Sequence, residues 1–294
     1  MKNLFKFSVI LLIIFTACDK DIPYDLQDDL YNYVEPDYPQ NLEGRYLSYI
    51  YIEAPDIPNP PFQSGKKVEF VYDNKNYVDH ILIYGDNDEE QGREINIDYN
   101  VDGSVKRIKY YNNENAVITS YEQFEYDVLG RLFKFERFDK QDNSDLFDKK
   151  TMDIFYYPSN DTIIQMRYGE FYNFEDPFKD VYIKDENGNV REKVNYSNDE
   201  NSIYPTSSTD YIYDDKKRIF ENLDLPYYRI NYDSFQLYEI FSNNNWIGSQ
   251  AYSYDYDGTK IPFGELQTMN FEYDELGFPV SRNELIFYYY VDLD

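Results

Sequence analysis

Beyond residue 66, apolar residues recur at every second position, which is the period of a β-strand that buries one face. Ile95, Ile97 and Tyr99 alternate with polar residues, and Phe133 and Phe135 flank a lysine. No stretch of this region shows the apolar period of an amphipathic helix. The pattern therefore predicts an all-β domain.

The amino terminus has a different pattern. Lys2 and Lys6 lie around a short positive start, and residues 7–15 form an apolar run. This run is too short to cross a bilayer, because a spanning helix needs about 20 apolar residues. The positive start, the apolar run and the small residues after it follow the order of an export signal.

Residues 15–18, with the sequence Phe-Thr-Ala-Cys, resemble the lipobox that the lipoprotein signal peptidase reads. The resemblance implies a signal peptide over residues 1–17 and lipidation of Cys18, which is the single cysteine of the chain. An unpaired cysteine agrees with this role, since exported proteins usually pair their cysteines. A plain secretory signal with an incidental cysteine, or an uncleaved anchor, is the alternative.

By resemblance to bacterial lipoproteins, the acyl chains on Cys18 anchor the protein to a lipid bilayer. A charged segment, Asp-Lys-Asp, follows at residues 19–21. It resembles the tag of surface-exposed lipoproteins in some Gram-negative groups, whereas in other groups an aspartate at this place signals retention at the inner membrane. We expect an outer-membrane lipoprotein of the cell envelope that faces the cell surface.

The mature chain divides into two parts. Residues 18–45 are acidic, carry several prolines and show no sustained periodicity, so we expect them to form a tether. Residues 46–294 form the β domain, and their first strand is expected near residues 46–51.

A repeated unit is the most informative feature of the β domain. Residues 124–132, FEYDVLGRL, closely match residues 271–279, FEYDELGFP. Residues 99–103, YNVDG, are the same unit with asparagine in place of aspartate. Looser copies start at Tyr72, Asp185, Tyr213 and Tyr254.

Turn chemistry explains this unit without any ligand. An aspartate or asparagine side chain accepts a hydrogen bond from the backbone two residues ahead, and glycine takes the left-handed conformation that closes a short hairpin loop. Asp73, Asn100 and Asp127 follow one another at steps of 27 residues, and a hairpin with its connection occupies about 25 to 30 residues. About eight such hairpins predict an antiparallel meander that forms a curled sheet or a half-open barrel.

Two regions depart from the repeated unit. The copy at residues 156–158, Tyr-Tyr-Pro, lacks both the aspartate and the glycine. Residues 228–250 blur the repeat, so we expect the sheet to be interrupted there.

The units at residues 124–132 and 271–279 resemble the Tyr-Asp repeat of Rhs-type wall and toxin-shell proteins. They look more like the uncharacterised bacterial lipoproteins built of Tyr-Asp-x-x-Gly hairpins, including a family of unknown function with a porin-like fold. The resemblance covers about residues 66–294 and implies the fold. It implies no function, because the family has no settled activity.

Composition narrows the range of partners. The chain has 56 acidic and 28 basic residues and a net charge of −28. Nucleic acid is therefore a poor partner, because phosphate binding needs clustered lysine and arginine. The 35 tyrosines and 21 phenylalanines argue against disorder, since disordered chains are poor in aromatic residues.

No catalytic constellation stands out in the sequence. His80 is the only histidine, so a Ser-His-Asp site would depend on it and a multi-histidine metal site is excluded. Its alternating surroundings favour an ordinary strand histidine. Cys18, once lipidated, is no nucleophile. We expect no enzymatic activity and no cofactor.

Two polar loops and one aromatic residue are candidate binding features. Residues 86–90, DNDEE, and 185–189, DENGN, offer the oxygen ligands that calcium prefers, without EF-hand spacing, and turn chemistry is the favoured interpretation. Trp246 lies beside an asparagine-rich turn. It either stacks on a sugar ring or covers the edge of a core, and the second is the more common arrangement.

These features favour a non-enzymatic surface lipoprotein that binds a glycan or another envelope protein through its aromatic sheet or the mouth of a half-open barrel. A structural or scaffolding part of an envelope assembly is the first alternative. A hydrolase that uses paired carboxylates is the second.

Overall fold

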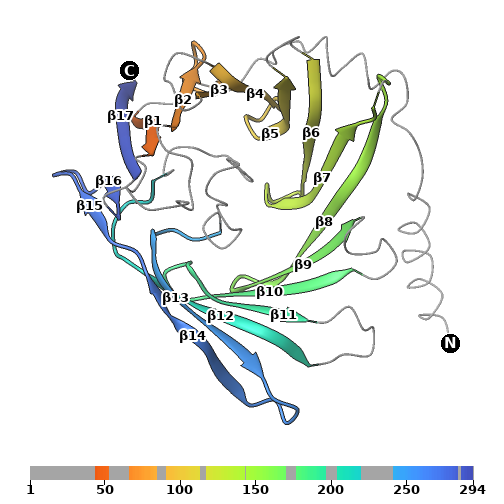
Figure 1. Cartoon of the computed structure of the whole chain (residues 1–294), viewed down its shortest axis with the longest axis vertical. Coiled ribbons are helices and arrows are strands. Elements are labelled where there is room, and N and C mark those ends of the chain that lie inside the picture. Colours follow the sequence, from red (N-terminus) through yellow and green to blue (C-terminus); the bar gives the residue numbers. More distant parts are fainter. Residues whose placement is uncertain are drawn as a thin grey trace, which may run out of the picture.

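The computed structural model describes nine ranges of the chain, and within them it contains one antiparallel β-sheet and no helix (Figure 1). The described ranges are 44–52, 66–84, 91–112, 117–142, 144–169, 177–196, 204–219, 241–283 and 286–293. In these ranges, no helix has the length and apolar character that a membrane-spanning helix requires.

The sheet has 17 strands. They are β1 (Gly44–Ile52), β2 (Lys66–Tyr72), β3 (Val78–Tyr84), β4 (Gln91–Tyr99), β5 (Val105–Asn112), β6 (Val117–Tyr126), β7 (Leu132–Lys140), β8 (Phe147–Ser159), β9 (Thr162–Gly169), β10 (Phe178–Lys184), β11 (Val190–Tyr196), β12 (Pro205–Tyr213), β13 (Trp246–Tyr254), β14 (Lys260–Thr268), β15 (Phe271–Tyr273), β16 (Pro279–Arg282) and β17 (Ile286–Leu293).

The strands follow chain order from β2 to β14, each pairing with the next. β1 pairs with both β2 and β17, and β17 continues through β16 to β15. Between β14 and β15 the described residues form no ladder, so the sheet is open there. The predicted all-β class and antiparallel meander are confirmed, and β1 is the strand expected near residues 46–51.

The sheet continues across the region where an interruption was expected. β12 pairs with β13 along a ladder that runs from Ser207 opposite Ser253 to Tyr213 opposite Trp246. The interruption predicted within residues 228–250 is therefore wrong for residues 246–250, and residues 228–240 lie outside the described ranges. The repeat unit is lost in this segment, but backbone pairing requires no particular side chain.

The turns form as the repeated unit predicts. The carboxylate Oδ1 of Asp127 accepts hydrogen bonds from the backbone N–H groups of Leu129, at 2.9 Å, and Arg131, at 3.0 Å. Gly130 has a φ of 74°, in the left-handed region that glycine adopts without strain. Asn76 takes the place of this glycine in the first copy, with a φ of 68°.

Repeat tyrosines join the three consecutive hairpins β4–β5, β6–β7 and β8–β9 each to the hairpin before it, a role that the sequence pattern did not indicate. The hydroxyl of each tyrosine donates to the backbone carbonyl of the first residue in a strand of the preceding hairpin. The pairs are Tyr99 to Val78 at 2.9 Å, Tyr126 to Val105 at 3.0 Å and Tyr157 to Leu132 at 2.8 Å. Tyr157 belongs to the copy without aspartate and glycine, so the tyrosine bond persists where the turn has changed.

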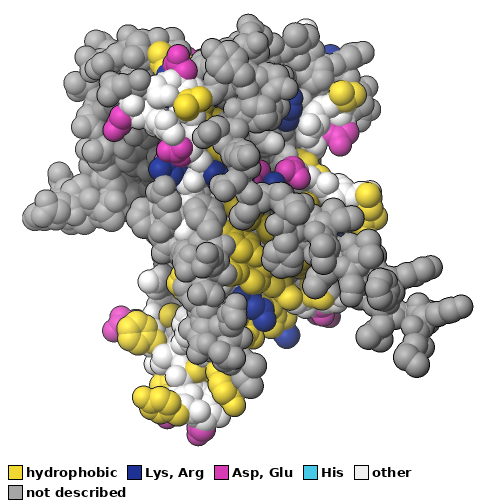
Figure 2. All heavy atoms as spheres, turned by 90° about the vertical axis from the view of Figure 1, so that its right-hand side faces the viewer, with side chains coloured by type: hydrophobic (Ala, Val, Ile, Leu, Met, Phe, Trp, Pro, Cys, Tyr) yellow, Lys and Arg dark blue, Asp and Glu magenta, His cyan; other side chains and the backbone are white. Residues whose placement is uncertain are grey.

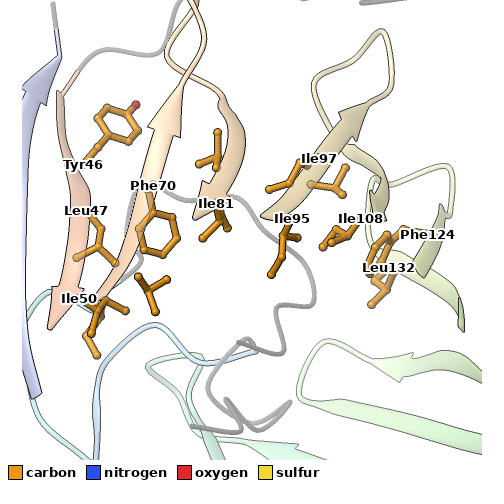
Figure 3. Packing of buried hydrophobic residues seen from close by; sticks show 14 of the residues in the cluster. Tyr46, Leu47, Ile50, Phe70, Ile81, Ile95, Ile97, Ile108, Phe124 and Leu132 are labelled. Carbon is orange, nitrogen blue, oxygen red and sulfur yellow. The ribbon is translucent and has the colours of Figure 1, made fainter. Parts of the chain in front are cut away.

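One face of the sheet carries the main hydrophobic cluster, and we call it the core face. Figure 3 shows side chains from β1 to β7 in this cluster, among them Leu47, Phe70, Ile81 and Phe124. A smaller cluster formed by Ile118, Tyr121, Phe138 and Phe147 lies on the opposite face. Both faces of the middle of the sheet are therefore buried in part.

Replacing Tyr99 with phenylalanine tests the bond between hairpins. Tyr99→Phe removes the hydroxyl that donates to Val78 and leaves a buried carbonyl without this donor, so the free energy of unfolding should fall by about 1–2 kcal/mol. The matched control is Tyr156→Phe, because Tyr156 is 46 % exposed and its hydroxyl has no hydrogen bond among the described residues. Denaturant titration should show a change within about 0.5 kcal/mol for the control. Equal losses in both variants would contradict the proposed role of the bond.

Candidate functional site

A cavity of about 330 Å³ opens beside the turns that carry the repeated unit. This volume lies at the lower end of the range of about 300–1,000 Å³ that small-molecule pockets occupy. Its walls come from successive hairpins and from the segment before β13. The lining residues are Ser104, Tyr126, Gly130, Arg131, Leu132, Tyr157, Ser159, Asn160, Ile163, Lys184 and Phe241.

The repeat places these residues together. Each copy ends its strand at the same end of the sheet, so turns that are separated in sequence become neighbours. Gly130 and Arg131 belong to the β6–β7 turn, Asn160 to the β8–β9 turn, and Lys184 ends β10. The cavity is therefore a product of the repeat spacing and of the pairing order.

Aromatic rings form one part of the wall. The hydroxyls of Tyr126 and Tyr157 donate to backbone carbonyls, which holds both rings in place. Phe241 lies edge-on to Phe155 and Tyr182, with ring centres 5.8 and 5.9 Å apart. Burial raises the pKa of Tyr157 to about 12 despite the opposing charge of Arg131, so the phenol is neutral at physiological pH.

Arg131 is held in a fixed position at the cavity. Its Nε and NH2 atoms lie 2.8 and 2.6 Å from Oδ2 of Asp127. Its Cζ lies 4.2 Å above the ring centre of Tyr157, within the range of a cation–π contact. The hydrogen bond from Arg131 lowers the pKa of Asp127, which keeps this turn carboxylate ionised.

Lys184 is the second cation in the cavity wall, and no carboxylate pairs with its side chain among the described residues. The side chain is half-buried. Burial lowers the pKa of the ammonium group, and the positive charge of Arg218 lowers it further. The lining residues that the structure describes include no aspartate or glutamate, although acidic residues outnumber basic ones two to one in the chain.

The structure places Trp246 in the core, away from this cavity. The residue is 8 % exposed, and its indole N–H donates to the carbonyl of Gly248. Its ring meets Tyr211 edge-on. The ring therefore covers the core, which is the interpretation that the sequence favoured, and offers no exposed face on which a sugar could stack.

The other candidate residues have structural surroundings or lie outside the described ranges. Nδ1 of His80 on β3 lies 2.8 Å from the carboxylate of the adjacent Asp79. In the turn at residues 185–189, Asp185 accepts the backbone N–H groups of Asn187 and Asn189, so turn chemistry accounts for its carboxylate. Cys18 and residues 86–90 lie outside the described ranges. Within those ranges, no group of three or more potential metal-ligating side chains comes together.

Two buried carboxylates on the core face bear on the hydrolase alternative. Gln165 bridges from Asp153, at 2.8 Å, to the hydroxyl of Tyr182, at 2.7 Å. Oδ2 of Asp180 lies 2.8 Å from Arg167 and 3.3 Å from Lys193, and Oδ1 accepts a hydrogen bond of 2.6 Å from Asn195. Both carboxylates have hydrogen-bond or ionic partners, as buried polar groups in a structural network do.

Sequence reasoning found part of this site. The repeated unit identified the turn that contains Gly130 and Arg131 and the strand end at Tyr126. Lys184 and Phe241 carry no local signal, because their relation to the turns depends on which strands become neighbours.

Comparisons with known proteins show distant structural similarity. No family model and no curated protein matches this chain. A porin-like protein from Bacteroides uniformis ATCC 8492 is similar with a TM-score of 0.37 and 8 % identity, over 86 % of this chain and 100 % of that one. A protein of unknown function, BF3112 from Bacteroides fragilis NCTC 9343, has a TM-score of 0.33 and 14 % identity, over 51 % of this chain and 91 % of that one.

A toxin complex is also similar over part of its length. The structure of TcdB2-TccC3-Cdc42 has a TM-score of 0.30 and 12 % identity, over 74 % of this chain and 12 % of that one. At these TM-scores the similarities do not establish a function. The resemblance to Tyr-Asp-repeat lipoproteins stays a prediction, since no family model matches.

Replacing Lys184 with methionine tests whether this lysine serves stability. A half-buried ammonium without a carboxylate partner disfavours the folded state, so Lys184→Met should leave the free energy of unfolding unchanged or raise it by up to about 1 kcal/mol at pH 7. The pKa of Lys184 is lower in the folded state than in the unfolded state, where it is about 10.4. The unfolded state therefore binds more protons between these two values, and wild-type stability rises with pH in that window.

The increase in the free energy of unfolding that Lys184→Met brings should therefore become smaller as the pH approaches about 10.4. Denaturant titrations at pH 7 and pH 10 measure it, with Lys179→Met on the same strand as the control. A loss of more than about 1 kcal/mol in Lys184→Met alone would mean that the lysine stabilises the fold.

Proposed function

We propose that this chain is a lipid-anchored, non-enzymatic protein of the bacterial outer membrane that binds a glycan in the cavity beside its tyrosine–aspartate turns. The observation that carries the proposal is the make-up of the cavity wall. Tyr126, Tyr157 and Phe241 supply aromatic surface, while the amide of Asn160 supplies groups that can hydrogen-bond to hydroxyls. An apolar, aromatic pocket with a few convergent polar groups is the usual form of a small-molecule site.

The sequence supports the proposed location in the cell envelope. The lipobox-like segment that ends at Cys18 would place the β domain outside the cytoplasm on an acidic tether. The net charge of −28 disfavours nucleic acid and anionic membrane surfaces as partners. Glycans and envelope proteins remain the partner classes that fit an exported domain of this composition.

A specific observation also favours the scaffolding alternative. β14 is an edge strand of the sheet, and Ile261, Phe263 and Leu266 on it are 43, 71 and 50 % exposed. Figure 2 shows hydrophobic side chains at the projecting lower end of the molecule, where Figure 1 places the β13–β14 hairpin. Exposed edge strands with apolar side chains can pair with another chain.

Substitution of Cys18 tests the anchor. Cys18→Ser removes the thiol that receives the lipid, so incorporation of labelled palmitate should be lost and the protein should leave the membrane fraction. Thr16→Ser, a conservative change in the same segment, is the control and should retain the label. Palmitate incorporation that survives in Cys18→Ser would overturn lipidation at this residue.

A bulky residue in the cavity wall tests the binding site. Asn160 lies in the exposed β8–β9 turn, so Asn160→Trp should fill the cavity without disturbing the core. The full chain in detergent, screened on a glycan array, should bind a glycan that Asn160→Trp no longer binds. Glu186→Trp, the same change in the exposed β10–β11 turn, is the control and should retain binding. Equal binding by all three proteins would rule out this cavity as the site.

A further inference from the structure

We propose that the cavity beside the tyrosine–aspartate turns selects an acidic sugar, with Lys184 and Arg131 receiving an anionic oxygen group on the sugar ring. This inference rests on the proposed function and names the ligand class of the same site. Equal binding of a neutral sugar in this cavity would agree with the proposed function but would contradict selection for an acidic sugar.

The described wall of the cavity carries positive charge, whereas the net charge of the chain is negative. Acidic residues outnumber basic residues by 56 to 28 in the whole sequence, yet the described lining residues include Lys184 and Arg131 and no aspartate or glutamate. Arg218 lies close enough to Lys184 to affect it electrostatically. In a protein of this composition, cations gathered along the described part of a cavity wall favour an anionic ligand.

Among the described residues, Lys184 lacks the carboxylate partner that a half-buried ammonium normally has. Most other lysines of the described β domain contact carboxylates, as Lys109 does with Asp98 at 2.8 Å and Lys149 with Glu136 at 2.7 Å. Lys184 has no carboxylate partner among the described residues, and its place in the cavity wall leaves room for one from a ligand. A carboxylate or sulfate group bound there would provide the missing counter-charge.

Arg131 would supply the second contact in a defined orientation. Asp127 holds one edge of its guanidinium group, and the ring of Tyr157 lies beneath it. A guanidinium has more N–H donors than these contacts use, and its planar fork fits a carboxylate or sulfate. Because Arg131 is already positioned, little conformational entropy is lost when a ligand binds.

The remaining wall suits the sugar ring itself. Tyr126, Tyr157 and Phe241 provide apolar surface for its C–H groups, and the side chains of Ser159 and Asn160 provide partners for its hydroxyls. A cavity of about 330 Å³ accepts a small ligand or one terminal unit of a longer chain. The volume of the cavity, its aromatic surface and its charge therefore all fit one acidic sugar unit.

Isothermal titration of the full chain in detergent with paired methyl glycosides tests this inference. The probes are glucuronate and galacturonate, their neutral counterparts glucose and galactose, and the 6-sulfates of the two neutral sugars. At least one acidic glycoside should bind roughly tenfold or more tightly than its neutral counterpart. The carboxylate and sulfate arms identify which anionic group the site prefers.

Two variants on β10 provide the matched comparison. Lys184→Gln should weaken binding of the acidic glycoside roughly tenfold to a hundredfold and leave a neutral one unchanged. Lys179→Gln removes the same charge from the opposite face of the strand, where Lys179 lies over Tyr196, and should have no effect. Unchanged melting temperatures in both variants show that the fold is intact.

Two outcomes would overturn the inference, and they differ in what they say about the proposed function. A neutral glycoside that binds as tightly as its acidic counterpart, with no effect of Lys184→Gln, would contradict selection for an acidic sugar and support glycan binding. Binding of no glycoside in the panel and no glycan on the array would overturn both.

Discussion

The hydrogen bond from a repeat tyrosine to the backbone of the preceding hairpin is the interaction on which the rest of the structure depends. Strand ladders alone join any two neighbouring strands, but they do not specify how far each hairpin is displaced along its neighbour. Tyr99, Tyr126 and Tyr157 each bond to the first residue of a strand in the hairpin before. This contact sets the same displacement at these three steps and holds their turns together at one end of the sheet.

The alignment of the turns has a chemical consequence. Asp73, Asp127 and Asp185 each accept backbone N–H groups of their own turn, so carboxylates collect at this end of the sheet. At the cavity, however, Asp127 is engaged by the N–H groups of its own turn and by Arg131. Asp127 and Arg131 compensate each other in this ion pair, and Lys184 is the cation of the described cavity wall that has no carboxylate partner among the described residues.

The amino-acid sequence predicted the parts of the fold that depend on local order. The alternation of apolar residues, the aspartate cap at Asp127 and the left-handed Gly130 all follow from residues adjacent in the chain. The tyrosine bonds, the continuation of the sheet from β12 to β13 and the position of Lys184 depend on strands that meet only after folding. For Trp246 the structure shows the arrangement that is more common for such a residue, a ring that covers the core, while its neighbour Tyr211 comes from another strand and carries no local signal.

Local and long-range electrostatics act in opposite directions on an anionic ligand. The net charge of −28 repels an anion that approaches the protein surface, and salt at physiological ionic strength screens this repulsion beyond a Debye length of about 8 Å. Lys184 and Arg131 attract it only once it has entered the cavity, where solvent screening is weaker. Moderate salt should therefore relieve the repulsion during approach more than it weakens the attraction inside. An acidic ligand of this protein would bind with a weak salt dependence, unlike a ligand drawn in by a broad basic surface.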